Sequence, residues 1–461
     1  MSRAKPTCLN CPEADSLVYG SLESLRSFLI HTYGSVKDAE RELGVHEGAI
    51  QRRLIDRQPL RHRDFLSLIH NATDGRPQLA LSEILGLQIP QSVDPAYCLQ
   101  RFAPPFKGTS KLLESLAKVE VETSSSTQFE GLEAGVYPEL HRLRVTDPKA
   151  ARVRIASELP RATDSARAKP AALPTLLGLI SLWVASLRAS NNPSTAYRAL
   201  IEAFRLSKAL PPQHEVHTIL KQNAIYLLTH QSLTHATAVA AQNTHLAALY
   251  ASSRYGETLV DLGMVHSLEG QFQQARTYYL SSLDHLPAEN WNSRCAALLS
   301  LAIDSLRLGD PETARHFSSR AIEQHPEDLI SSLTPRLFWI EGLLAYLRQD
   351  FECALTLVTQ AADAIGRYSA QEDVALATLQ LVEIHLRLGN RAEAMTLVSS
   401  QLTRLISQAS TTKHTRDLLL DFLTTFLSTP EPTPRIVLGA IRAIASKAAT
   451  GLQPFHASLP R

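Results

Sequence analysis

The stretch GETLVDLGMVHSLEGQFQQARTYYLSSLDHLP, residues 256–287, decides the fold of this chain. It holds two runs of helical length, with Gly270 between them and Pro287 at the end. Glycine often ends a helix because it adopts the left-handed conformation without strain, and proline cannot continue a helix. The stretch therefore predicts two antiparallel helices joined by a tight turn.

The same pattern recurs along the second half of the chain. A small residue is needed where the two helices cross closely, at the start of the second helix. Gly309 and Gly389 occupy the turn position of Gly270, whereas Gln349 replaces it in one copy. Hairpins of this kind are expected to stack, because one hairpin cannot bury its apolar face alone. The small residue recurs at spacings of 40, 39, 39, 40 and 40 residues, as Ala196, Ala236, Ala275, Ala314, Ala354 and Ala394.

These residues resemble the tetratricopeptide repeat family over roughly residues 174–408, and the match is closest in residues 256–287. The period is longer than the family's, which is about 34 residues. Ser282 and Gln401 stand where the family has a small alanine. The resemblance implies a right-handed superhelix with a concave face and does not identify the ligand of that face. We expect a peptide or protein ligand there.

A second motif, VKDAERELGVHEGAIQRRL, occupies residues 36–54. Ser35 can cap its first helix, and Gly44 is expected to make the turn. The motif resembles the helix-turn-helix of bacterial Cro/repressor-like transcription regulators. Residues 57–69 resemble the turn and the fourth helix that follow in that group. The predicted inward-facing residues are Ala39, Leu43, Ile50 and Leu54.

The resemblance implies that the motif's second helix, around residues 46–54, reads base edges in DNA with its exposed polar side chains. Arginine suits guanine and glutamine suits adenine. Residues 50–63 carry five arginines against one acid, Asp56, which places positive charge near DNA phosphates. A vestigial or protein-binding version remains open, because Glu40 replaces a small alanine of the motif and Glu47 would repel phosphate. The predicted DNA contacts are His46, Gln51, Arg52, Arg53 and Arg57.

Composition agrees with an all-α chain. Of its 461 residues, 44% are hydrophobic and 20% are charged, and leucine and alanine dominate over aromatic residues. We expect a flexible tail over residues 1–20, a helix-turn-helix domain over 21–75 and a linker with short helices over 76–145. A repeat array should follow over 146–410, with capping helices and a tail over 411–461.

Other features indicate a cytoplasmic protein without catalysis. The formal net charge is +1, and an odd count of five cysteines fits a reducing compartment. Residues 1–17 lack the apolar core of a signal peptide, and the apolar stretch Leu176–Leu187 is too short to cross a bilayer. Cys8 and Cys11 have zinc-like spacing, but no second pair follows. Without a metalloprotease, phosphate-loop or nucleophile-elbow motif, we expect no enzyme, cofactor or metal.

The sequence favours a DNA-binding transcription regulator whose array binds a peptide, a protein partner or a second protomer. The alternative is a non-catalytic protein-interaction scaffold that does not bind DNA.

Overall fold

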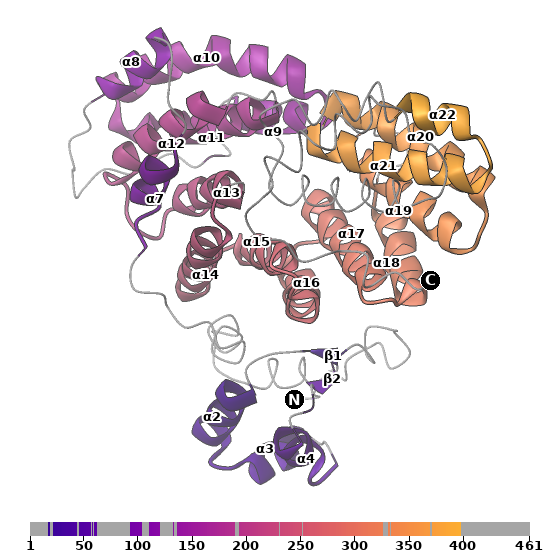
Figure 1. Cartoon of the computed structure of the whole chain (residues 1–461). Helices are drawn as coiled ribbons and strands as arrows, with labels where there is room; N and C mark the ends of the chain where they lie inside the picture. The colour runs from indigo at the N-terminus through magenta and orange to yellow at the C-terminus, as the bar shows by residue number, and fades with distance from the viewer. Residues whose placement is uncertain are drawn as a thin grey trace. The chain divides into compact units, whose positions relative to one another are not determined.

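The computed structural model describes residues 17–18, 22–43, 46–56, 58, 60–61, 93–103, 110–119, 132, 136–189, 193–229, 231–250, 252–325, 331, 333–368 and 371–397. Helices make up almost all of this part of the chain (Figure 1). Its one sheet pairs two strands of two residues each, β1 (Leu17–Val18) and β2 (Leu60–Arg61). The prediction of an all-α chain is confirmed.

The helices follow one another in three groups. The N-terminal group is α2 (Leu22–Tyr33), α3 (Val36–Leu43) and α4 (Ala49–Ile55). The second group is α7 (Pro95–Phe102), α8 (Lys111–Ala117), α9 (Tyr137–Thr146) and α10 (Pro148–Ala168), with the 3-10 turn η1 (Pro170–Ala172) after it. The third group is the repeats: α11 (Leu173–Ala189), α12 (Pro193–Ser207), α13 (Glu215–Thr229), α14 (Leu233–Leu249), α15 (Tyr255–Leu268), α16 (Phe272–His285), α17 (Trp291–Arg307), α18 (Pro311–Gln324), α19 (Thr334–Leu347), α20 (Phe351–Tyr368), α21 (Gln371–Arg387) and α22 (Arg391–Leu397).

The recurring alanines mark the same point of every repeat. Each is the fourth residue of a second helix, α12, α14, α16, α18, α20 or α22, and each has an exposed fraction of 0%. At such a fully buried position, a larger side chain would overpack the contact between the helices. The predicted helical-hairpin repeat is therefore confirmed.

The turns between the helices are left-handed, as the glycine pattern predicts. Gly270, Gly309 and Gly389 have φ angles of 80°, 75° and 76°. Gln349 has a φ of 64° at the corresponding turn, although it is not a glycine. The left-handed turn is thus kept even where the residue that adopts it most easily is missing.

The contact between α15 and α16 shows how tightly the helices approach. A Cβ atom added to Gly263 would lie 2.7 Å from the ring of Tyr279, and that ring is itself buried. Such a distance is too short for two carbon atoms, so the backbone at Gly263 forms one wall of the Tyr279 site. Gly263, which follows Leu262 in the repeat motif, therefore has a packing role.

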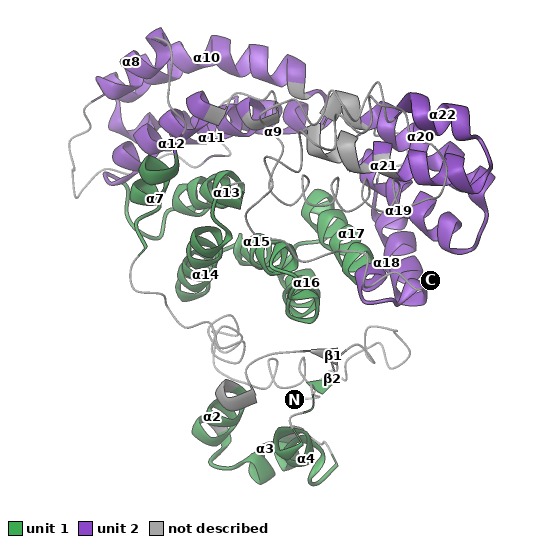
Figure 2. Ribbon diagram, in the orientation of Figure 1, with its two compact units in different colours: residues 1–102, 210–304 green, residues 103–209, 305–461 purple. Residues whose placement is uncertain are grey.

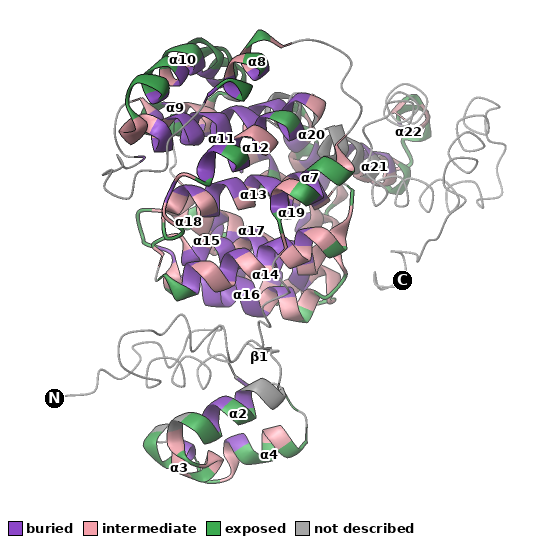
Figure 3. Ribbon diagram, turned by 90° about the vertical axis from the view of Figure 1, so that its left-hand side faces the viewer, coloured by how far each residue is buried: buried purple, intermediate pink, exposed green. Residues whose placement is uncertain are grey.

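The chain divides into two compact units (Figure 2). One comprises residues 1–102 and 210–304, and within it α13 packs on α14, α14 on α15, and α15 on α16. The other comprises residues 103–209 and 305–461; there α10 packs on α11, α11 on α12, and α19 to α22 pack in succession. Figure 3 shows buried positions along the repeat helices and exposed positions on α10.

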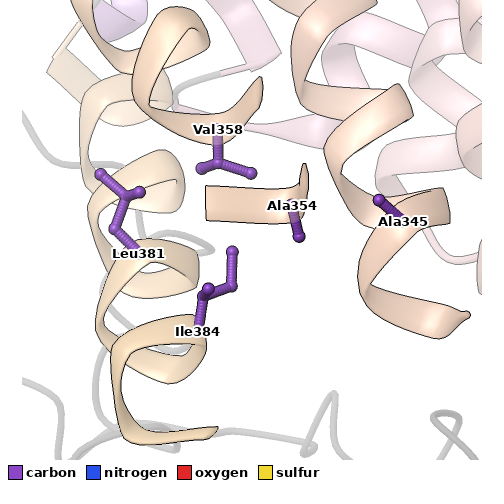
Figure 4. Packing of buried hydrophobic residues seen from close by; sticks show 5 residues of the cluster. All are labelled: Ala345, Ala354, Val358, Leu381 and Ile384. Atoms are coloured by element: carbon purple, nitrogen blue, oxygen red, sulfur yellow. The ribbon is translucent and has the colours of Figure 1, made fainter. Parts of the chain in front are cut away.

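A cluster of buried aliphatic side chains joins α19, α20 and α21 (Figure 4). The recurring Ala354 lies at its centre, so the close helix crossing and the apolar core coincide. Its members are Ala345, Ala354, Val358, Leu381 and Ile384.

The segment expected as a linker contains helices that pack on the repeats. α8 packs on α10 and α12, and α9 packs on α10 and α11. Arg205 of α12 secures the end of α8 by donating to the carbonyl oxygens of Leu116, Ala117 and Val119 over 3.0–3.4 Å. An arginine with several donors can satisfy the carbonyls that a helix end leaves open. The short helix α8 is therefore held by a residue that lies more than 80 residues further along the chain.

α10 is a long helix of 21 residues at the start of the expected repeat array. Asp147 caps its first turn by accepting from the backbone N–H groups of Lys149 and Ala150. The helix then continues through Pro160 to Ala168. Pro160 lies on the exposed side, where the loss of one backbone hydrogen bond exposes the freed carbonyl to water.

The described segment Pro170–Leu187 extends the apolar stretch Leu176–Leu187 at its N-terminal side, and by length and composition this longer segment could cross a membrane. Of this segment, 72% is buried inside the protein, as is typical of a core helix. The helices expected over residues 414–448 and the cysteines Cys8 and Cys11 lie outside the described residues.

The turns can be tested by a matched pair of substitutions. Gly309→Ala should lower the free energy of unfolding by about 1 kcal/mol, because a Cβ atom penalises the left-handed backbone. No atom lies within 4 Å of that Cβ position, so the effect isolates the backbone. Gln349→Gly should change stability in the opposite direction by up to about 1 kcal/mol. Urea unfolding followed by circular dichroism measures both, and an unchanged midpoint for Gly309→Ala would contradict the interpretation.

Candidate functional site

The three N-terminal helices form a small core of their own. Leu25, Phe28 and Leu29 of α2 are buried together with Ala39 of α3 and Ile50 of α4. The predicted cap at the start of α3 is present: the backbone N–H of residue 38 donates to Ser35 Oγ over 3.1 Å. Helices α2, α3 and α4 contact one another in each pairing. The helix periodicity of the sequence therefore places the polar residues of α4 on its outer side.

Glu40 is the buried acid that holds α4 in place. Its side chain is 1% exposed, and Oε1 accepts from the backbone N–H groups of Ile50 and Gln51 over 2.6 and 2.8 Å. Oε2 accepts from the backbone N–H of Gly48 over 2.6 Å. These N–H groups belong to the start of α4, where a helix leaves donors open and where negative charge is stabilised.

From the sequence alone, Glu40 is an unexpected residue, because a small alanine is usual at this position of the motif. The structure gives a different role: the carboxylate replaces the missing side-chain cap of α4, whose N-cap residue is Gly48. A buried carboxylate is tolerated here because backbone donors satisfy both of its oxygens.

Glu47 also has a partner. Its carboxylate lies 2.7 Å from Lys37 Nζ, and both side chains are largely exposed. The hydrogen bond and the charge of the partner raise the pKa of Lys37 and lower the pKa of Glu47. The negative charge that would repel phosphate is therefore paired, although a salt bridge in water is weak.

The residues predicted to contact DNA have different environments. His46, Gln51 and Arg52 are exposed, and Arg53 is half-buried. Arg52 Nε donates to the carbonyl oxygen of Gly48 over 3.0 Å, which orients the guanidinium along α4. Arg57 lies outside the described residues, so its prediction stays a prediction.

Other parts of the motif depart from expectation. Leu54 is half-buried where the sequence predicts a buried residue, and Gly44 lies outside the described residues. At residues 60–61, near the start of the predicted post-recognition region, the chain forms strand β2. Leu17 pairs with Arg61 and Val18 with Leu60, so the end of the expected N-terminal tail belongs to this domain. Residues 62–92, which include the expected fourth helix, lie outside the described residues.

Polar side chains also join the first helices of neighbouring repeats within each unit. Tyr346 of α19 donates from its hydroxyl to Glu383 of α21 over 2.5 Å, and Arg387 Nε donates to the same hydroxyl over 3.3 Å. Burial, together with the neighbouring Glu383, raises the pKa of Tyr346 to about 12, so the phenol stays protonated and can donate. In the other unit, Ser267 of α15 donates to Asp304 of α17 over 2.7 Å. First helices of neighbouring repeats are thus joined by polar side chains.

Among the described residues, no group of three His, Cys, Asp or Glu side chains is placed to bind a metal ion. The polar contacts reported above connect helices.

No protein-family model matches the chain, and no curated protein matches it in sequence. Among solved structures, the chain is similar to the crystal structure of the APC/C hetero-tetramer Cut9-Hcn1, with 13% identity and a TM-score of 0.46. That match covers 74% of this chain, which spans only 61% of the other. A structure of BtubC (BKLC) from P. vanneervenii matches with 15% identity and a TM-score of 0.27, over 62% of this chain and 95% of the other. Both similarities are too low to carry a statement about function.

Glu40 provides a direct test of the N-terminal site. Glu40→Ala should lower the free energy of unfolding of this domain by about 2 kcal/mol, because backbone donors at the start of α4 lose their acceptor. Glu40→Gln keeps one acceptor oxygen and should cost less. Amide hydrogen exchange of residues 46–56 measures the local effect. Glu47→Gln, which removes only an exposed partner, is the control and should leave exchange in α4 nearly unchanged. Equal exchange in Glu40→Ala and the wild type would refute the cap.

Proposed function

We propose that the repeat array is a non-catalytic scaffold that binds a peptide or protein partner. The observation that carries this proposal is the adjacency of first helices, with Tyr346, Glu383 and Arg387 joining α19 to α21. A surface to which several repeats contribute can grow with the number of repeats, which suits an extended partner. We place the partner on the first helices α19 and α21, as part of the predicted concave face.

The surface around Tyr346 has mixed character. Arg387 is exposed and carries positive charge, while the hydroxyl of the half-buried Tyr346 accepts from its Nε and orients it. Exposed arginines beside aromatic rings are common anchors in protein interfaces. A second protomer is an alternative partner, and light scattering across a concentration series distinguishes a homodimer from a monomer.

A charge reversal tests the location of the partner. Arg387→Glu on a first helix should weaken capture of the partner at least tenfold if this face binds it, because one favourable charge becomes an unfavourable one. Arg315→Glu on the second helix α18 is the control and should leave capture unchanged. Affinity purification of the full chain with quantitative mass spectrometry identifies the partner. Titration with the purified partner then gives the ratio of the dissociation constants of the variant and the wild type. Equal losses for both variants would place the binding site elsewhere.

We propose duplex DNA as the ligand of the N-terminal domain, which would make the whole chain a transcription regulator. The supporting observation is that Glu40 fixes α4 with Gln51 and Arg52 exposed on its outer side. Glutamine and arginine offer paired hydrogen bonds to adenine and guanine. Regulation would then depend on the partner bound by the array.

Binding to pooled random duplex DNA tests this proposal. In a salt series followed by fluorescence anisotropy, log affinity should fall with log salt by about 0.9 for each phosphate contact. The double variant Arg52→Ala/Arg53→Ala should lose most of this affinity. The control Arg315→Ala/Arg348→Ala changes the same number of charges within the array and should keep it. Absence of binding by the wild type at low salt would leave the scaffold as the function.

A further inference from the structure

The start of α4 is closed to an external anion. A phosphate at a helix N-terminus uses the free backbone N–H groups of the first turn. In this chain Glu40 already accepts from three of those donors, on Gly48, Ile50 and Gln51. Its negative charge also offsets the positive end of the helix. Any ligand of α4 must therefore be recognised by side chains along the helix.

The side chains that remain available form one strip. Gln51 and Arg52 are exposed, and Ile55 follows four and three residues later, which places it on the same side of the helix. Ile55 is 70% exposed, and no large apolar side chain among the described residues is more exposed. Leaving such a side chain in water costs free energy, so a ligand that covers it gains affinity.

The chemistry of the strip is specific. Arg52 uses Nε to bind the carbonyl oxygen of Gly48, and among the described residues no partner is placed on its two Nη groups, which can donate in parallel. Gln51 offers one donor and one acceptor, and Ile55 offers a methyl surface. In the major groove, guanine presents two acceptors, adenine an acceptor with a donor, and thymine a methyl group. The three side chains thus match three kinds of base edge.

We propose that Ile55 is a specificity-determining residue that contacts the C5 methyl group of a thymine in the major groove. This inference rests on the proposed binding of DNA by the N-terminal domain. It assigns recognition to the Gln51–Arg52–Ile55 strip and gives the start of α4 no phosphate contact.

Exchange of thymine for uracil tests the contact, because the two bases differ in major-groove shape only by that methyl group. The full chain is first used to select its preferred duplex site from random DNA. Each thymine of that site is then replaced by uracil in turn, and affinity is measured by anisotropy. For the wild type, one replacement should weaken binding about fourfold, the effect of one buried methyl group. Ile55→Ala should bind the thymine and uracil forms of that site equally.

The matched control is Ile30→Ala, which trims another exposed isoleucine of this domain, 45% exposed on α2. It should keep the fourfold preference for thymine. Thermal melting should be unchanged for Ile55→Ala, since its side chain is mostly in water. If the wild type binds DNA but no uracil exchange matters, or if Ile55→Ala keeps the preference, the inference is wrong and DNA binding stands. If the wild type binds no DNA, both proposals are wrong.

Discussion

The close crossing of two helices at a buried alanine is the contact on which the repeat array depends. Each of these alanines is fully buried at the fourth position of its helix. A larger side chain would push the helices apart, and the displacement would reach the next hairpin because neighbours share one core. The ring of Tyr279 against Gly263 shows the same requirement on the other helix, where the absence of a Cβ atom makes room. The size of the side chains at a few positions therefore sets how closely the helices of each hairpin pack.

The turns show how packing can impose a costly backbone conformation. Three glycines adopt the left-handed region with little strain, yet Gln349 adopts it as well. A residue with a Cβ atom keeps such a conformation only when surrounding contacts determine it. The helices on either side, α19 and α20, pack closely and share the core around Ala354. Their contact holds the turn that the local sequence alone would disfavour.

In the N-terminal domain, the short helix α4 of seven residues has to be held in place. So short a helix is marginal in isolation, and its first donors need acceptors. Glu40 provides them from the preceding helix and so fixes α4 relative to α3. The outer face of α4 is then presented in one orientation, which is what recognition of a ligand requires. The chain thus has two features of different chemistry, a short strip of side chains on α4 and polar contacts that join first helices of neighbouring repeats within each unit.

The sequence by itself determined the features that depend on neighbouring residues. The helical class, the period of the repeat, the left-handed turns and the Ser35 cap could all be read from residues close together in the chain. The exposure of Gln51 and Arg52 also followed from helix periodicity. Only the tertiary structure decided which distant groups meet. Glu40 looked unfavourable until the N–H groups of α4 were placed against it, and Arg205 orders α8 from 86 residues beyond Val119. The reason is that the free energy of a buried charge or an open helix end depends on its hydrogen-bond partner, and the tertiary fold determines that partner.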